Sequence, residues 1–166
     1  MQEMVASRTN SAVADARGTA PEFAVRLVGA LLAVAIAAVH VADQGGIKAM
    51  ASPAWIGWGY RLIEAGGILT ALVLLLPGTA LPAPMRFGQV RLGPAWLGPA
   101  SLGWAAGVLL GTGPFLGYIA SRTVGVPGDP GDVGNWGYWV GTVSLLVEAA
   151  LVMLSVSMLA AFRPRR

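Results

Sequence analysis

The segment GYWVGTVSLLVEAALVMLSVSMLAA, residues 137–161, is predominantly apolar and contains a single charged residue, Glu148. A hydrocarbon core about 30 Å thick needs roughly 20 consecutive apolar residues in a helix. Because the segment meets that length, it predicts a transmembrane helix that carries a carboxyl group near its middle.

The composition of the whole chain agrees with a membrane protein. Of its 166 residues, 55% are hydrophobic and 11% are charged, and the mean hydropathy is +0.67. A soluble domain normally carries about 25% charged residues. Three further apolar runs, at about 24–42, 59–77 and 98–120, are long enough to cross a membrane. We therefore predict an all-α, polytopic membrane protein in which residues 24–161 form a four-transmembrane-helix bundle.

The segments outside the spans predict the orientation. Residues 1–23 form a polar tail, expected to be disordered or bound to a partner, and residues 162–166 form a basic C-terminal tail. If the helices alternate, both tails and the 78–97 loop lie on one side, with eight of the 11 basic residues: Arg8, Arg17, Arg26, Arg86, Arg91, Arg163, Arg165 and Arg166. The positive-inside rule then places both termini in the cytoplasm. Since these residues form no clustered groove, we expect no binding of nucleic acid.

Small residues recur at helical spacing and predict close helix packing. Without a hydrophobic driving force between helices in lipid, small side chains let the backbones approach. The third span has one stripe at Gly103, Gly107 and Gly111 and a second at Gly113 and Gly117. The residues assigned to helix packing are Gly103, Gly107, Gly111, Gly113, Gly117, Pro114 and Ser144.

Glu148 is expected to lie deep in the bilayer. It follows Trp136, at the predicted membrane interface, by 12 residues, and the helical rise puts it roughly 18 Å below that interface. A charge there costs at least about 2.5–3.5 kcal/mol, so Glu148 should face protein and be protonated or paired. No basic residue is predicted at this depth. We expect an uncharged Glu148 that donates to a neighbouring helix, with the Leu110 carbonyl freed by Pro114 as acceptor, and with Ser144 one turn away.

Three other polar residues are predicted at shallower levels. His40, Glu64 and Arg122 each lie near the outer end of a span and are expected to form one cluster, with Tyr118 in the same region. One interpretation is an ion pair that fixes the helix register, and the other is a site for a small anion, a quinone or haem. Glu148 likewise fastens helices, handles protons or a ligand inside the bundle, or contacts a larger membrane partner.

Catalytic signatures are missing from the sequence. It contains no phosphate loop, zinc signature or nucleophile elbow, and it has no cysteine. We therefore assign no catalytic residue and no metal site, and we do not expect a self-contained hydrolase or ATPase. No cofactor is required by the sequence, although haem and quinone stay open.

Two segments resemble known families. GYIASRTVGVPG at 117–128, followed by NW at 135–136 and GTVSLLVEAAL at 141–151, resembles an uncharacterised group of small four-helix membrane proteins from actinobacteria and other high-GC bacteria, with the pattern GYxxSRTxGxPG…NW…SLxxE. The resemblance implies a multi-pass protein of the bacterial plasma membrane and carries no function. RLIEAGGILTALVLLLPG at 61–78 resembles DoxX-like membrane proteins, which implies a link to quinone or thiol redox chemistry.

Two functions are expected from these observations. The first is a non-catalytic accessory or stabilising subunit of a larger bacterial membrane complex, with the lipid bilayer and either partner subunits or further copies of the chain around it. The alternative is a protein that binds a small ligand (quinone, haem or lipid) or couples transport to protons. Its candidate residues are His40, Glu64, Arg122, Glu148 and Tyr118.

Overall fold

The computed structural model describes residues 2–76 and 99–161, with side chains described at 22–76 and 101–161. Its helices are α1 (Gln2–Asp43), α2 (Ala54–Leu75), α3 (Pro99–Thr123) and α4 (Trp139–Ala161), with a short 3-10 helix, η1 (Pro130–Asp132), before α4. The described residues form no β-strand. Each α-helix contains a segment long and apolar enough to cross a membrane. The predicted all-α, four-helix membrane fold is confirmed.

Local chemistry sets the helix boundaries of the first hairpin. α1 ends at two glycines with positive φ, Gly45 (+89°) and Gly46 (+116°), and the Gly46 N–H donates to the Val41 carbonyl over 2.8 Å. Glycine adopts this left-handed conformation without steric cost. α2 begins at Ala54, five residues earlier than predicted, directly after the extended Pro53. Proline favours the start of a helix, since its fixed φ is compatible with the first turn and it lacks an N–H to satisfy.

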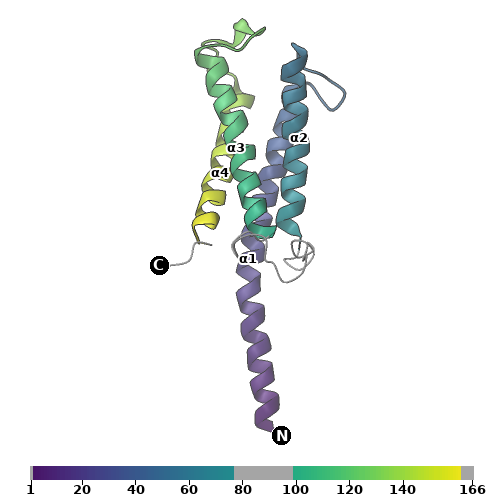
Figure 1. Ribbon diagram of the computed structural model, residues 1–166, viewed down its shortest axis with the longest axis vertical. Coiled ribbons are helices and arrows are strands. Elements are labelled where there is room, and N and C mark those ends of the chain that lie inside the picture. Colours follow the sequence, from purple (N-terminus) through teal and green to yellow (C-terminus); the bar gives the residue numbers. More distant parts are fainter. Residues whose placement is uncertain (1, 77–98, 162–166) are drawn as a thin grey trace, which may run out of the picture.

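The N-terminal segment, predicted to be a polar tail, has a helical backbone. The α1 backbone is helical from Gln2 and projects well beyond the bundle (Figure 1). Residues 2–17 contain neither glycine nor proline and are rich in alanine, the strongest helix former. The predicted 78–97 loop and the basic tail at 162–166 lie outside the described residues.

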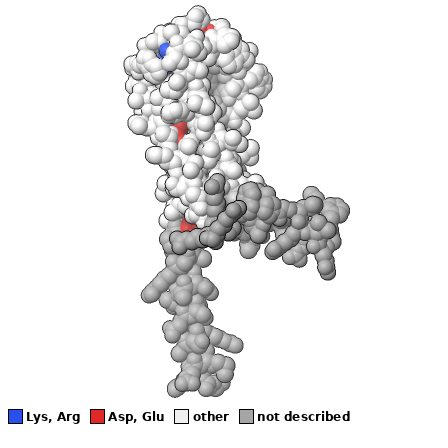
Figure 2. Space-filling model, turned by 60° about the vertical axis from the view of Figure 1, so that its left-hand side comes forward, with Lys and Arg blue, Asp and Glu red and all other residues white. Residues whose placement is uncertain are grey.

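The four helices form a ring with antiparallel neighbours. α1 packs against α2 and α4, and α3 also packs against α2 and α4, while α1 and α3 make little contact. α1 enters and α4 leaves the bundle at the same end, here called the terminal end (Figure 1). The connections at 44–53 and 124–138 lie at the other end, here called the hairpin end. One face of the bundle carries almost no charged side chains along its length (Figure 2), as expected of a surface that contacts lipid.

The bundle is solidly filled from its middle toward the terminal end. The buried apolar side chains that form the core cluster are Ala30, Ala33, Ile36, Ala71, Leu74, Trp104 and Leu151. A Cβ added at Gly111 would lie 2.8 Å from the Glu148 carbonyl oxygen, and one at Gly103 would lie 2.9 Å from a Leu74 methyl. The predicted close contacts of Gly103, Gly107 and Gly111 are therefore present, with α2 at Gly103 and with α4 at the other two.

The second predicted stripe, Gly113 and Gly117, does not pack against a neighbouring helix. A Cβ added at Gly113 or Gly117 would meet no atom within 4 Å, so the prediction that these glycines pack against another helix is wrong. α2 and α3 diverge toward the hairpin end (Figure 1), and Gly113 and Gly117 line the space between them. Pro114 and Ser144 line the same space rather than a tight helix contact.

Candidate functional site

A cavity of about 860 Å³ extends from the hairpin end past the middle of the bundle, as far as Thr70 of α2 and Ala106 of α3, and is lined by all four helices. This volume is within the range of small-molecule sites in proteins. Leu62 of α2 and Leu109 of α3 both line the cavity and are 73% and 75% exposed. The cavity therefore opens sideways between α2 and α3, at the surface that faces lipid.

Glycines create the two walls at that opening. Gly59 and Gly66 line the cavity from α2, and Gly113 and Gly117 line it from α3. A Cβ at Gly59, Gly113 or Gly117 would enter empty space, and one at Gly66 would touch only Leu110, at 3.5 Å. The small residues thus leave room for a ligand where larger side chains would fill the gap.

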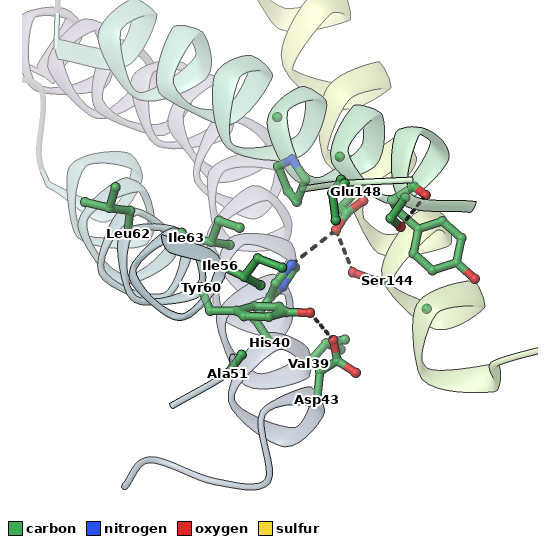
Figure 3. A pocket seen from close by; sticks show the side chains of 18 of the residues that line it. Val39, His40, Asp43, Ala51, Ile56, Tyr60, Leu62, Ile63, Ser144 and Glu148 are labelled. Carbon is green, nitrogen blue, oxygen red and sulfur yellow. Dashed lines mark hydrogen bonds and ion pairs between the residues drawn. The ribbon is translucent and has the colours of Figure 1, made fainter. Parts of the chain in front are cut away.

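His40 and Glu148 both line this cavity and point toward one another (Figure 3). His40 Nε2 lies 3.8 Å from Glu148 Oε1, and the Ser144 hydroxyl donates to the same oxygen over 2.5 Å. The His40 and Glu148 residues are 6% and 1% exposed. The second carboxyl oxygen of Glu148, Oε2, is buried and has no hydrogen-bond partner.

The direction of helical side chains explains why these residues meet. Side chains in an α-helix tilt toward the N-terminus of their own helix. In α1 that direction leads from the hairpin end into the bundle, whereas in the antiparallel α4 it leads toward the hairpin end. His40 and Glu148 therefore lean toward each other, and Glu148 also reaches back to Ser144, one turn earlier on α4.

The environment of Glu148 corrects the sequence prediction. Glu148 is buried and faces the bundle, as predicted, but its hydrogen bond comes from Ser144 of its own helix, not from the carbonyl freed by Pro114. A basic side chain also lies at its depth, since His40 approaches it from α1. The helical rise per residue gives the depth of each Cα atom only. The side chains of His40 and Glu148 tilt toward each other and cover the remaining difference in depth.

The predicted cluster of His40, Glu64 and Arg122 is not formed. Glu64 accepts a hydrogen bond from Arg61 over 2.6 Å and another from Gln44, and it does not line the cavity. Arg61 lies three residues before Glu64 on the same helix face, where residues at this spacing are neighbours. The local ion pair therefore takes Glu64 away from the predicted partners.

Arg122 instead joins α3 to the second connection. Its guanidinium pairs with Asp132 of η1, and its Cζ lies 4.5 Å from the centre of the Tyr118 ring. Arg122 and Tyr118 line the cavity near the hairpin end. The Tyr118 hydroxyl and Arg122 Nε are buried without hydrogen-bond partners, so each can still donate to a ligand.

A second polar group near the hairpin end was missed from the sequence. Asp43 of α1 accepts hydrogen bonds from the hydroxyls of Tyr60 and Tyr138, each over 2.6 Å, and thereby ties α1 to α2 and to the start of α4. The hydrogen bond to Asp43, with some burial, raises the pKa of Tyr138 to about 12. From the sequence, Asp43 is expected only to be a carboxylate in a loop. Its separation from Tyr60 and Tyr138 along the chain matches no helical repeat that would predict a contact.

Among the residues whose side chains are described, no group of three or more His, Asp or Glu residues is placed to hold a metal ion. Comparison with protein-family models, with curated proteins and with solved structures gives no match. The resemblances to the actinobacterial group and to DoxX-like proteins therefore stay predictions, and the function has to be argued from the cavity itself.

Proposed function

We propose that this multi-pass membrane protein binds a small, membrane-soluble ligand with a carbonyl or hydroxyl head, of the quinone and quinol class, in the hairpin-end cavity. The observation that carries the proposal is the buried, unpartnered Oε2 of Glu148 beside His40 Nε2 in the part of the cavity farthest from the polar residues of the hairpin end. A buried polar group without a partner costs about 1–3 kcal/mol. A ligand that supplies the missing partner recovers part of that free energy.

The donor and acceptor pattern favours this ligand class. A protonated Glu148 donates from Oε2 to a carbonyl, and the lone pair on His40 Nε2 accepts from a hydroxyl. The site therefore suits both the quinone and the quinol form of one headgroup. The Tyr118 hydroxyl, also buried and unpartnered, offers a further donor toward the hairpin end.

The lateral opening favours access from the bilayer. Leu62 and Leu109 at its edges are apolar and exposed, so a hydrophobic tail remains in lipid while the head enters the cavity. Haem is less well matched, because its carboxylates need cations and the one arginine among the cavity residues, Arg122, is already paired with Asp132.

The location belongs to the same proposal. We place the protein in the bacterial plasma membrane, with both termini cytoplasmic, on the basis of the distribution of basic residues along the sequence and the family resemblance. The accessory-subunit function stays a prediction, since nothing in the described part of the chain identifies a partner surface.

Direct binding tests the proposal. The full chain in lipid nanodiscs is titrated with a short-tailed ubiquinone or menaquinone analogue, and quenching of tryptophan fluorescence is followed. We expect saturable binding that weakens about tenfold in Glu148→Leu and in His40→Leu, because leucine neither donates nor accepts and one hydrogen bond worth about 1.4 kcal/mol is lost in each. The matched control is Glu64→Leu, which lies outside the cavity and should bind as the unmodified chain does.

Equal binding by the unmodified chain and all three variants would exclude the proposed site. The absence of any saturable binding of either analogue would exclude the ligand class. Addition of haem, followed by its absorbance spectrum, tests the competing ligand in the same samples.

A further inference from the structure

The hydrogen bonds around His40 and Glu148 define where a proton resides. His40 Nδ1 lies 2.9 Å from the Ile36 carbonyl oxygen, which only accepts, so Nδ1 carries a hydrogen. Nε2 faces Glu148 Oε1 at 3.8 Å, a separation too long for a direct hydrogen bond. One further proton therefore has two alternative positions, His40 Nε2 and the Glu148 carboxyl group.

Burial favours the state with that single proton. With one proton shared between His40 and Glu148, the pair has no net charge, whether it is written as imidazole and acid or as imidazolium and carboxylate. Adding or removing a proton leaves a net charge on side chains that are almost fully buried, and such a charge is costly in the membrane interior.

Other charged and titratable groups surround the pair on the side of the hairpin end. They are Asp43 of α1, Tyr60 and Glu64 of α2, Tyr118 and Arg122 of α3, Asp129 and Asp132 of the second connection, and Tyr138 before α4. The Tyr60 ring lies 5.3 Å from the His40 ring, centre to centre. Apart from Glu64 these residues line the cavity, so a polar route leads from the pair toward the hairpin end.

On the opposite side the bundle is closed. Ile36 lies one turn beyond His40 toward the terminal end, and Leu151 lies three residues beyond Glu148 in the same direction. Both are 0% exposed, as are Leu74 and Trp104. Ser155 Oγ and Trp104 Nε1 are polar atoms in this half, but they are buried without partners and do not line the cavity. Thr70 of α2 and Ala106 of α3 extend the cavity past the pair toward the terminal end, and the buried Thr70 hydroxyl is polar. Nearer the terminal end than these two, no residue of the described part of the chain lines the cavity.

We propose that His40 and Glu148 form a proton-binding site that exchanges its proton only with the aqueous phase at the hairpin end. The site shares the cavity of the proposed function but stands without the ligand. A proton that enters from the hairpin end returns to the same side, so the closed half acts as the barrier that a proton-coupled protein needs between its two sides.

Cysteine accessibility tests the direction of access, and the chain suits this method because it contains no cysteine. Ser144→Cys places a thiol beside Glu148, and Ser155→Cys is the matched control on the same helix, beyond the barrier. Vesicles are sorted by capture through a C-terminal tag, so that the terminal end faces outward. A charged, membrane-impermeant thiol reagent is then supplied outside or inside, with no quinone added.

We expect Ser144→Cys to react only with reagent supplied at the hairpin end, and Ser155→Cys to react from neither side. Reaction of Ser144→Cys from the terminal end, or reaction of Ser155→Cys from either side, would overturn the one-sided route. A Ser144→Cys chain that reacts from neither side would also contradict it, provided that the thiol is modified after the bundle is unfolded.

Infrared spectroscopy of the chain without cysteine substitutions tests the proton site itself. The carboxylic C=O band of Glu148 is identified by its loss in Glu148→Gln and its retention in Glu64→Gln. The pH is stepped on one side of sorted vesicles at a time. We expect the band to change with the pH at the hairpin end alone, and its midpoint to move in His40→Gln. A band that follows the terminal-end pH, or a midpoint unchanged in His40→Gln, would exclude the shared proton site.

These measurements separate the two proposals. One-sided access with no quinone binding would remove the proposed ligand and leave the proton site. Quinone binding with access from both ends would exclude the one-sided proton site and leave the proposed ligand.

Discussion

The two halves of the bundle use the same kind of residue in opposite ways. Gly107 and Gly111 of α3 bring its backbone against α4 in the closed half, whereas Gly113 and Gly117 of the same helix face empty space. The spacing of the two glycine stripes is identical, four residues in each case. A stripe of small residues therefore shows only that bulky side chains are absent from that helix face. The position of the neighbouring helix determines whether its backbone packs there or a cavity remains.

The largest expected difference between the halves concerns leucine. Leu74 is 0% exposed in the closed half, and Leu109 is 75% exposed at the cavity opening. Leu74→Ala should destabilise the bundle by about 2–5 kcal/mol, as in other cores, and toward the lower value here because lipid is as apolar as leucine. Leu109→Ala should change stability little. Unfolding of both variants in mixed detergent micelles checks this, and equal losses would contradict the division into halves.

The glycines provide a closer comparison. A Cβ at Gly111 would lie 2.7 Å from Val152 Cγ2, so Gly111→Ala should cost about 1–3 kcal/mol through overpacking. Gly113→Ala, two residues later, meets no atom and should be neutral or stabilising, since alanine favours a helix over glycine by up to about 1 kcal/mol. Thermal unfolding of the two variants measures the contrast. A Gly113→Ala chain as unstable as Gly111→Ala would show that the cavity is closed in the membrane.

The hairpin end should respond to alkaline pH. Because the pKa of Tyr138 is raised from 10.0 to about 12, the folded state favours the protonated phenol. This contribution to stability is complete below about pH 10 and is lost as the pH rises toward 12. Tyr138→Phe should cost about 1 kcal/mol at neutral pH, the net value of a typical hydrogen bond, and should remove this part of the pH dependence. Unfolding measured from pH 8 to 12 checks it, with Trp139→Phe as the control.

The smallest expected effect on stability is at the boundary between the halves. Ser144→Ala removes the hydroxyl that donates to Glu148 Oε1, and hydrogen bonds in membrane bundles are worth about 0.6 kcal/mol on average. Ser157→Ala, which removes an exposed hydroxyl bonded to the Met153 carbonyl of its own helix, is the control and should change stability less. A loss well above 2 kcal/mol in Ser144→Ala would show that Glu148 serves mainly to fasten the bundle.

Several features of the candidate site were visible in the sequence. The isolated charge in an apolar run identified Glu148 as buried, because only protein surroundings tolerate a carboxyl group at that depth. His40 was selected for its position late in a span. Their direct approach was missed, and the signal that would have indicated it is the antiparallel order of α1 and α4 together with the tilt of helical side chains. The predicted position of Glu64 is wrong because Arg61, three residues earlier on the same helix, pairs with it.

The sequence by itself determined the number of membrane helices, their approximate bounds and the burial of Glu148, since these follow from length, hydropathy and the cost of a charge in lipid. Only the tertiary structure decided that α2 and α3 separate at the hairpin end, that Gly113 and Gly117 line a cavity, and that His40 faces Glu148. The reason is physical: hydropathy is a property of each segment alone, whereas a cavity and a pair of facing side chains depend on the relative tilt and rotation of separate helices, which neither hydropathy nor spacing specifies.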